Sequence, residues 1–566
     1  MNTLYYGDNL TVLRNEIKDE SVNLVYLDPP FNSDATYNVL FRSTSGERSQ
    51  AQIEAFEDTW HWGTEAENAF DDVMRQPNTD ASEMLRSFRQ FLKENDMMAY
   101  LSMMAIRLIE LHRVLKPSGS LYLHCDSTAS HYLKVLMDAV FAHTNFRNEI
   151  IWRRTGSHNS ARRYGPIHDT ILFYSKAKAY HWRRVFRHYM RGYVESFFNK
   201  KDQTGIYRSQ TLTGSGTRKG DSGKVWRDYD PTAKGRHWAF PGVLAEELGL
   251  EEESLHRKLD VLAEQGLLAP TDVDGLPEYR QYLHQSRGVP LQDIWAYQPY
   301  TQGCLMGSKD AIDNDVRWLD KRGSNERLGY PTQKPIGLLE RIVSASSEEG
   351  DVVLDPFCGC GSTIHAAQKL KREWIGIDIT HLAISLIEKR LKDAFPGIQY
   401  EVHGTPKDLE GARALAAQDK YQFQWWAVAL VNAVPFSGKK KGADTGIDGL
   451  IYFKPEGKTS EKAIVSVKGG ENVNVTMIRD LGHVVDRENA RIGVFITLAE
   501  PTRPMRTEAI KAGFYETLYG KFPKLQILTI ADLFAGKQPN IPFVDSATFK
   551  KAPKEVEGGK QDDLPF

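Results

Sequence analysis

The chain has 566 residues and a formal net charge of −2, so it is too long for one ordinary domain and its total charge predicts no bulk attraction to nucleic acid or membrane. Hydrophobic residues make up 41% and charged residues 26%, which excludes global disorder. The four cysteines predict neither a disulfide scaffold nor a zinc site. Because no apolar run approaches the ~18 residues of a membrane span, we expect a soluble protein of a reducing cytoplasm.

Charge is distributed unevenly along the chain. Residues 151–240 carry 19 Lys and Arg against 6 Asp and Glu, whereas residues 45–96 carry 5 against 12. A chain that is nearly neutral overall but polarised locally indicates one cationic working face.

Strand and helix patterns alternate over residues 1–152. Strands are expected at 2–6, 21–27 and 120–124, and helices at 97–115 and 128–141. Such alternation predicts an α/β domain with helices on both faces of a sheet. Residues 153–330 are irregular and basic, and two short helix patterns in 241–285 resemble a small winged-helix piece.

Regular patterns return after residue 330. Over 331–405 we expect helices at 332–346, 362–370 and 383–392, with strands at 351–354 and 374–378. A further domain over 409–545 is expected to begin with one helix, 409–434, followed by strands at 449–453, 463–467, 492–497 and 525–529. Residues 546–566 have the composition of a flexible tail.

A rigid peptide, Asp28-Pro29-Pro30-Phe31, follows the second expected strand. Proline fixes φ and removes a backbone donor, which leaves the Pro29 carbonyl as a directed acceptor beside the Asp28 carboxylate. Together these oxygens can accept both N–H bonds of an exocyclic amino group, and Phe31 can stack on an extruded base. A plain turn at the end of the strand is the alternative, because Asp-Pro-Pro is common in such turns.

A second motif, Asp355-Pro356-Phe357-Cys358-Gly359-Cys360-Gly361-Ser362, joins a strand to a helix. Its glycines permit close approach of a ligand to the backbone, and the helix N-terminus offers free N–H groups. It is neither a Walker loop nor a full dinucleotide fingerprint. Asp378 ends the next strand, where a carboxylate can accept both ribose hydroxyls. The pattern favours a nucleoside-bearing cofactor, with a structural turn as the alternative.

With Tyr330-Pro331-Thr332-Gln333-Lys334-Pro335 between them, the two motifs resemble those of the β-class S-adenosylmethionine-dependent DNA amino-methyltransferases. Tyr6-Gly7-Asp8-Asn9, 115–120 and 167–174 also match, and the resemblance covers about residues 1–400. It implies a Rossmann-like fold with a mixed seven-stranded sheet, circularly permuted motif order and an inserted target-recognition region. Cys360 stands where a small serine is more usual.

The resemblance also implies roles for individual residues. Asp28, Pro29, Pro30 and Phe31 would hold the target amino group and stack the base. The cofactor, S-adenosylmethionine, would be bound by Asp8, Asp28, Thr332, Lys334, Asp355, Phe357, Gly359, Gly361, Ser362 and Asp378. Within this set, Asp8 would lie near the adenine, Asp378 would bind the ribose, and Thr332 and Lys334 would complete the methionine pocket.

The implied activity is site-specific methylation of double-stranded DNA by base flipping and direct transfer. Aspartate before the Pro-Pro pair is similar to adenine-N6 enzymes, and cytosine-N4 stays open. The resemblance further implies a prokaryotic, nucleoid-associated protein of a restriction-modification system, with a homodimer or a separate restriction subunit as partner. A DNA-binding scaffold with a relic methyltransferase fold is the alternative of another class, and an RNA substrate is a weaker option.

Arginines interleaved with aromatic residues follow the first domain, a composition that suits phosphate contacts and base stacking. A solvated charged surface is the alternative. Because this region lies between the two catalytic halves, we expect DNA contacts from Arg153, Arg154, Arg162, Arg163, Arg183, Arg184 and Arg187.

The C-terminal domain resembles the PD-(D/E)xK restriction-endonuclease fold. Asp444 and Asp448 precede one expected strand, and Lys468 ends the next, a layout that places a metal-binding carboxylate beside a lysine. Asp448 is therefore a candidate Mg²⁺ ligand with Lys468 as the nuclease lysine. Ser466 stands where Glu or Gln is expected, so we expect weak cleavage or none; restriction and modification in one chain is the alternative.

Overall fold

The structure is a computed structural model that describes residues 2–30, 36–42, 48–57, 61–156, 162–269, 275–299, 311–319, 326, 328, 332–436, 446–453, 455, 461–518 and 520–542. Two compact units are present: the described residues of 1–184, 292–297 and 315–558 form one, and those of 185–291 and 298–314 form the other. Within the described ranges, none of the helices combines the length and apolarity that crossing a bilayer requires.

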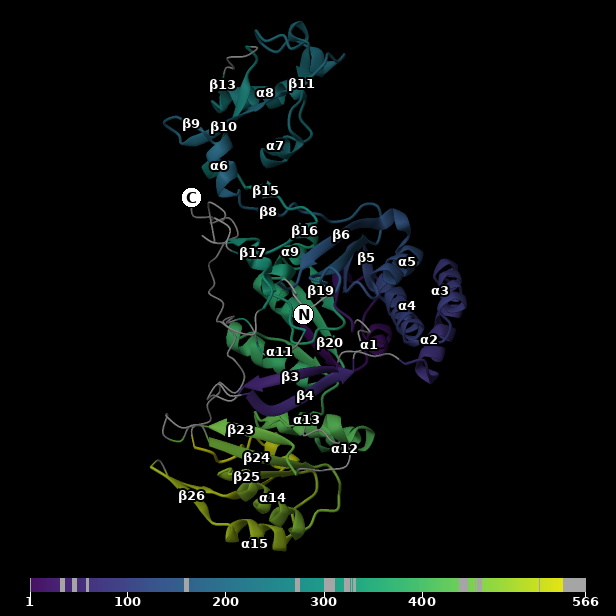
Figure 1. The fold of residues 1–566 in the computed structure, drawn as a ribbon, viewed down its shortest axis with the longest axis vertical. Coiled ribbons are helices and arrows are strands. Elements are labelled where there is room, and N and C mark those ends of the chain that lie inside the picture. The colour runs from purple at the N-terminus through teal and green to yellow at the C-terminus, as the bar shows by residue number, and fades with distance from the viewer. Residues whose placement is uncertain are drawn as a thin grey trace. The chain divides into compact units, whose positions relative to one another are not determined.

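The larger unit is built on a mixed nine-stranded sheet (Figure 1). Strand β7 (His168–Ser175) is antiparallel to both β5 (Leu115–Cys125) and β6 (Phe146–Arg153), whereas the other neighbours run parallel. This confirms the predicted mixed α/β sheet, and two short edge strands, β16 (Ile294–Trp295) and β21 (Glu401–His403), extend it beyond the seven strands expected. In spatial order the strands are β16 (Ile294–Trp295), β6 (Phe146–Arg153), β7 (His168–Ser175), β5 (Leu115–Cys125), β2 (Val22–Leu27), β19 (Val352–Asp355), β20 (Glu373–Asp378), β1 (Thr3–Tyr6) and β21 (Glu401–His403).

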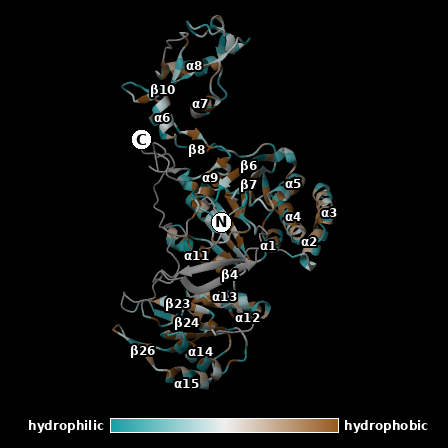
Figure 2. Ribbon diagram, viewed as in Figure 1, coloured by the Kyte–Doolittle hydropathy of each residue, from teal (hydrophilic) through white to brown (hydrophobic). Residues whose placement is uncertain are grey.

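Helices cover both faces of this sheet. On β2, Val25 and Leu27 join one core with α1 (Asn9–Asn15), α4 (Asp96–Val114) and α5 (Ser130–Phe141). Because side chains alternate along a strand, Tyr26 faces the opposite side. On β5, Tyr122 marks that second side, where its hydroxyl lies 2.7 Å from Ser346 Oγ of α9 (Ile336–Ser346). Figure 2 shows the apolar residues concentrated along α4 and the strands.

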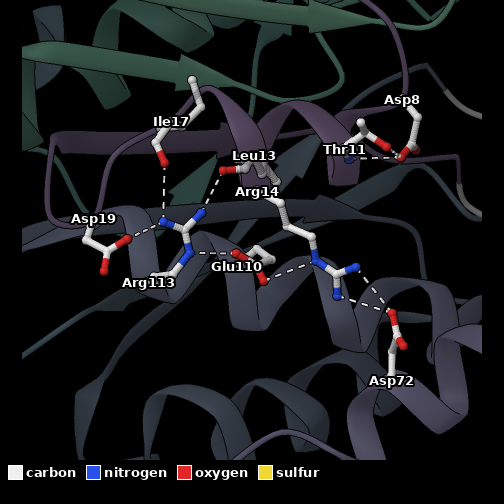
Figure 3. Close-up of polar contacts among 9 residues, drawn as sticks. All are labelled: Asp8, Thr11, Leu13, Arg14, Ile17, Asp19, Asp72, Glu110 and Arg113. Carbon is white, nitrogen blue, oxygen red and sulfur yellow. Dashed lines mark hydrogen bonds and ion pairs between the residues drawn. The ribbon is translucent and has the colours of Figure 1, made fainter.

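Two arginines tie α1 to its neighbours (Figure 3). Arg113 on α4 donates to the carbonyl oxygens of Leu13 (2.6 Å) and Ile17 (3.2 Å), which satisfies acceptors near the C-terminal end of α1. Arg14 on α1 pairs with Asp72 of α2 (Thr64–Met74) at 3.2 Å. Since α1 is anchored in this way, the loop before it, which enters the site described below, is held as well.

The second half of the sheet continues through α10 (Ser362–Lys369) and α11 (His381–Ala394), close to their predicted ranges. In the first half of the sheet, β5 starts at Leu115 rather than at the expected residue 120. Residues 116–120 therefore belong to this strand. The remaining elements of the first half are β3 (Thr36–Arg42), β4 (Arg48–Glu57) and α3 (Thr79–Leu92).

The smaller unit is narrower than the expected 153–330 insert, because β7 and β16 belong to the central sheet of the larger unit. Its core packs Trp226 and Trp238 with Leu259 and Leu262. Within 241–285 the described residues form two helices and an antiparallel pair of strands, and the winged-helix-like piece stays a prediction. The elements are β8 (Phe186–Arg187), α6 (Arg191–Phe197), β9 (Lys200–Lys201), β10 (Ile206–Thr211), β11 (Thr213–Ser215), β12 (Arg236–Trp238), α7 (Gly242–Glu247), α8 (Leu255–Glu264), β13 (Leu268–Ala269), β14 (Glu278–Tyr282), β15 (Val289–Pro290), β17 (Gln298–Pro299) and β18 (Ala311–Ile312).

The C-terminal region of the larger unit forms a separate five-stranded sheet. All four predicted strands are present, and the sheet runs β22 (Val434–Pro435), β23 (Gly449–Phe453), β24 (Glu461–Lys468), β25 (Ile492–Thr497) and β28 (Leu525–Thr529). The other elements are α14 (Val475–Arg487), α15 (Arg503–Lys511), β26 (Phe514–Thr517), β27 (Gly520–Pro523) and α16 (Ile530–Phe534). The expected tail, 546–566, lies outside the described residues.

The single helix expected over 409–434 is wrong. The structure has two helices, α12 (Leu409–Gln418) and α13 (Lys420–Leu430). Asp419 separates them, because its backbone is extended and its carboxylate accepts hydrogen bonds from the N–H groups of Tyr421 and Gln422. An aspartate that caps the following helix in this way ends the preceding one.

The C-terminal sheet shares a hydrophobic core with the central one. Leu382 and Leu386 of α11 pack in one cluster with Ile447, Leu450 and Ile478. Deleting residues 410–566 would therefore expose apolar surface on α11, so truncation is a poor test of whether methyl transfer needs the C-terminal domain.

Candidate active site

A cavity lies at the carboxyl ends of β1, β2, β19 and β20. These four strands are parallel and adjacent, so their carboxyl ends meet at one edge of the sheet. Its empty volume of about 1100 Å³, which includes the open mouth, is ample for a nucleoside-sized ligand. The predicted residues that line it are Asp8, Asp28, Pro30, Thr332, Lys334, Asp355, Phe357, Gly359, Ser362 and Asp378.

Three predicted residues are not among those lining the cavity. Pro29 and Gly361 lie next to lining residues, and Phe31 lies outside the described residues, as do Tyr330 and Pro331. The cavity also includes residues that the motifs did not single out, chiefly Tyr26, Arg107 and Thr380. For Tyr26 a signal existed, because it lies two residues before Asp28 on a strand and therefore on the same side.

Asp28 pairs with a lysine inside the cavity. Its Oδ2 accepts a hydrogen bond from Lys334 Nζ, and the two side chains are only 15% and 11% exposed. The other carboxylate oxygen, Oδ1, is buried and has no hydrogen-bond partner among the described residues. A buried carboxylate oxygen without a donor is costly, so this atom is poised to accept an N–H from a ligand.

The glycine loop is folded by its own backbone contacts. Gly361 has a φ of +74°, and a Cβ there would lie 2.8 Å from Ile387 Cγ1, so only glycine fits without strain. The Cys360 carbonyl accepts a hydrogen bond from Arg390 at 2.9 Å, and the Ser362 hydroxyl donates to the Lys334 carbonyl at 2.9 Å. The loop therefore delivers the N-terminus of α10 to the cavity in a set shape.

Asp378 binds the loop directly. Its Oδ2 accepts from Gly359 N at 2.9 Å, and its Oδ1 accepts from both the N–H and the hydroxyl of Thr380 at 2.9 Å. Burial raises the pKa of Asp378 to about 6, although these hydrogen bonds oppose the shift. Oδ1 already accepts two of these hydrogen bonds, so Oδ2 is the oxygen that can still accept a ligand hydroxyl.

Asp8 is the N-cap of α1. Its Oδ2 accepts from Thr11 N at 3.0 Å, and its Oδ1 pairs with Arg107 at 2.8 Å. Arg107 also donates to Asn9 Oδ1 at 2.6 Å. This network fixes the rim of the cavity at the end of β1.

Asp355 is the most buried of the cavity carboxyls, with 3% exposure. Burial raises its pKa to about 7, and the nearby charges of Asp28 and Asp378 add to the shift. The folded state therefore binds more protons at Asp355 than the unfolded state does, and this contribution to the free energy of unfolding falls as pH rises from about 4 to about 7.

Asp355→Asn is accordingly expected to stabilise the ligand-free protein at pH 8 by about 3 kcal/mol. Asparagine keeps the oxygen that accepts from Phe357 N at 3.1 Å but carries no charge. Urea unfolding of both proteins at pH 8 and pH 5 measures the difference, which should shrink at the lower pH. Equal stabilities at pH 8 would show that the buried carboxyl carries no such penalty.

The seven predicted DNA-binding arginines differ in their surroundings. Arg162, Arg163, Arg183 and Arg184 are exposed. The other three are partly buried: Arg153 donates to the Tyr297 carbonyl, Arg154 pairs with the buried Asp169 at 3.2 Å, and Arg187 pairs with Asp313 at 3.4 Å.

In the C-terminal domain, the carboxylate of Asp448 is already engaged. Its Oδ2 accepts from Val467 N at 2.6 Å, and its Oδ1 accepts from the Gln424 side-chain amide. Lys468 is half-buried at the end of β24, Ser466 is buried, and Asp444 lies outside the described residues. Across the described parts of the chain, no group of three or more His, Cys, Asp or Glu side chains is placed to hold a metal ion.

In comparisons with known protein families, the region that contains the cavity and the C-terminal domain match two different families. The family N6_N4_Mtase, described as DNA methylase, matches residues 22–389, and the family NACHT-associated inactive Restriction Endonuclease 1 matches residues 425–525. The Type II methyltransferase M.EcaI of Enterobacter cloacae is 29% identical over 69% of each chain. The Type III restriction-modification enzyme StyLTI Mod subunit of Salmonella typhimurium is 25% identical over 66% of this chain, which spans half of that relative's length.

Solved structures were also matched at low overall similarity. The M1.HpyAVI–SAM complex is 14% identical, covers 69% of this chain and all of its own, and has a TM-score of 0.28. The cytosine-N4-specific PvuII DNA methyltransferase is 12% identical, covers 70% of this chain and 89% of its own, and has a TM-score of 0.29. Because the DNA methylase family matches more than half of the chain, with the cavity's residues from Tyr26 to Thr380 inside the match, the protein belongs to the DNA methylase family.

Proposed function

We propose that the protein transfers a methyl group from S-adenosylmethionine to the N6 amino group of adenine at a specific site in double-stranded DNA. The observation that carries this proposal is the meeting of Asp28 and the Gly359 loop in one cavity, although more than 300 residues separate them. Asp28 suits the target amino group, and the Gly359 loop suits a nucleoside-bearing cofactor. The methyl-acceptor and methyl-donor sites therefore adjoin.

The cavity fits the cofactor on its own geometry. Its nucleoside end would lie between Asp378, which can accept ribose hydroxyls, and Asp8 at the rim. Its methionine end would be held by Phe357, Gly359, Thr332 and Lys334, with α10 contributing N–H groups. When bound, the cofactor supplies an electrophilic methyl group on a sulfonium.

The chain's own residues do the remaining work. Asp28 Oδ1 and the Pro29 carbonyl would accept the two amino N–H bonds, which holds the nitrogen lone pair toward the methyl group. The amino group is itself the nucleophile, so no covalent enzyme adduct is needed. Exposed Arg162, Arg163, Arg183 and Arg184 are the arginines best placed to bind phosphates, while Arg153, Arg154 and Arg187 would add contacts if DNA displaces their partners.

Cytosine N4 is the alternative target, because its amino group offers the same two donors and the family name covers both. Labelled S-adenosylmethionine with genomic DNA, followed by separation of the modified nucleosides, distinguishes N6-methyladenine from N4-methylcytosine. Competition with RNA tests the acceptor class. No label in any DNA, with cofactor binding confirmed by calorimetry, would leave the DNA-binding scaffold as the function.

We also propose that the protein acts in a restriction-modification system, as the printed name of the StyLTI Mod subunit suggests. Its location in the prokaryotic cytoplasm is part of the same proposal. Its partners would be DNA and a separate restriction subunit, with a homodimer as a further state. Long-read sequencing of host DNA with and without the gene would identify the methylated context.

The C-terminal domain is expected not to cut DNA. With Mg²⁺ or Mn²⁺ present, supercoiled plasmid should stay intact, because a hard cation prefers several anionic oxygens and Asp448 is bound by Gln424 and Val467 N. Asp448→Ala should instead lower the free energy of unfolding by about 2 kcal/mol, since it leaves the buried Val467 N–H without its acceptor. Robust cutting that Asp448→Ala stops would assign Mg²⁺ to this site and make the chain a bifunctional enzyme.

A further inference from the structure

Three buried polar side chains form a hydrogen-bonded chain that begins at the cavity. Tyr26 Oη lies 2.9 Å from His124 Nδ1, and His124 Nε2 lies 3.1 Å from Asp169 Oδ2. They come from β2, β5 and β7, which are neighbours in the sheet. Each is at most 2% exposed. None of the three has a role in the function proposed above.

This hydrogen-bonded chain of side chains starts beside Asp28, the proposed catalytic carboxylate. Tyr26 and Asp28 are two residues apart, on the same side of the polypeptide, and both line the cavity. Burial, followed by the charge of Asp28, raises the pKa of Tyr26 well above its usual value. A hydroxyl that stays protonated can receive a proton on its oxygen while it releases its own to a neighbour.

The partners define the tautomer of the histidine. An ionised Asp169 can only accept, so we assign the hydrogen to Nε2, which donates to Asp169, and Nδ1 is left to accept from the Tyr26 hydroxyl. Burial acts against ionisation of Asp169, but the His124 hydrogen bond and the charges of Lys334 and Arg154 lower its pKa below the usual range. An ionised aspartate behind a neutral histidine is the arrangement that stabilises an imidazolium when a proton arrives.

We propose that Tyr26, His124 and Asp169 form a proton relay for methyl transfer, an inference that rests on the proposed function. In the transfer one S–C bond breaks and one N–C bond forms, so the sulfonium becomes a neutral thioether and the cationic amino nitrogen must lose one proton. Asp28 accepts that proton, and because no direct hydrogen bond joins Asp28 to Tyr26, a water in the cavity would carry it to Tyr26 Oη while the Tyr26 proton moves to His124 Nδ1. When the products leave, the proton on His124 returns through Tyr26 to water.

Charged groups of both signs surround the relay. The carboxylates of Asp28 and Asp355 act on Tyr26. The cations of Lys334 and Arg154 act on Asp169, and Asp169 also interacts with Asp126. The Trp152 ring packs against His124 in a T-shaped contact, with 5.6 Å between the ring centroids. The relay therefore exchanges its proton through the cavity, so its state should follow the occupancy of the cavity.

Tyr26→Phe tests the relay, and Tyr122→Phe is the matched control. Tyr122 is also buried and loses a hydroxyl contact with Ser346, but it does not line the cavity. In single turnovers near pH 7, Tyr26→Phe should transfer the methyl group about 100-fold more slowly than wild type. Its rate should rise between pH 7 and pH 9, because hydroxide and buffer then take the proton, whereas the wild-type rate stays level. Tyr122→Phe should behave as wild type.

Two further readouts separate a relay from a structural link between strands. With a pH indicator, wild type should release its proton with the products, after the chemical step, whereas Tyr26→Phe should release it together with methyl transfer. Calorimetry should find cofactor affinity within about twofold of wild type, which shows that the cavity is intact. Asp169→Asn, which would reverse the histidine tautomer, should reproduce the slow rate if Tyr26→Phe fails to fold.

A wild-type rate and level pH profile in Tyr26→Phe would overturn the relay, as would an equal loss in Tyr122→Phe. Proton release that coincides with methyl transfer in wild type would also overturn it. If wild type itself transfers no methyl group to DNA, the proposed function fails instead, so the two failures are distinct.

Discussion

Asp28→Ala is expected to reduce methyl transfer at least about 1000-fold while it leaves cofactor affinity within a few-fold. The carboxylate is proposed to orient the target amino group, so its loss should appear in the chemical step rather than in cofactor binding. Single-turnover transfer to DNA and calorimetric cofactor binding measure the two quantities separately.

The ion pair with Lys334 requires a second variant in this experiment. Alanine leaves a largely buried lysine without its carboxylate partner, which costs stability for reasons unrelated to catalysis. Asp28→Asn keeps the side chain's shape and one acceptor oxygen but removes the charge, and it should also lose most of the transfer rate. If both variants retain transfer but lose cofactor binding, Asp28 belongs to the cofactor site.

Asp378→Ala is expected to weaken cofactor binding about 100-fold, with a smaller effect on the transfer rate at saturating cofactor. Two losses combine, because Asp378 is the proposed acceptor for the ribose hydroxyls and also holds Gly359 N and Thr380. Asp378→Asn retains part of the loop contact, so it should bind the cofactor more tightly than Asp378→Ala does.

Acid should produce the same weakening in the wild-type protein. The pKa of Asp378 is raised to about 6 in the free protein, and hydroxyl donors of the ligand favour its ionised form. Protonation of Asp378 therefore opposes binding, and affinity should fall by up to tenfold per pH unit below about pH 6. Affinity that is constant from pH 7 to pH 5 would contradict this role for Asp378.

The sequence by itself predicted the two motifs of the larger unit and the strands that precede them, β2 and β19. Apolar runs such as 21–27 and 492–497 predicted strands correctly, because a strand that is buried on both faces appears in the sequence as a short, nearly continuous apolar run. The break at Asp419 was missed, since an aspartate inside an apolar helical pattern reveals a cap only when its backbone is known to be extended.

Tertiary structure alone decided which of these residues meet. Spatial strand order, with β2 beside β19 and β20 beside β1, brings Asp28, Asp355, Asp378 and Asp8 to one edge, and chain order does not reveal it. It also joins His124 and Asp169 to Tyr26, and it engages Asp448 and Arg154 in internal contacts. A motif shows what a side chain can bind, but the partner is chosen by packing across strands that are distant in sequence.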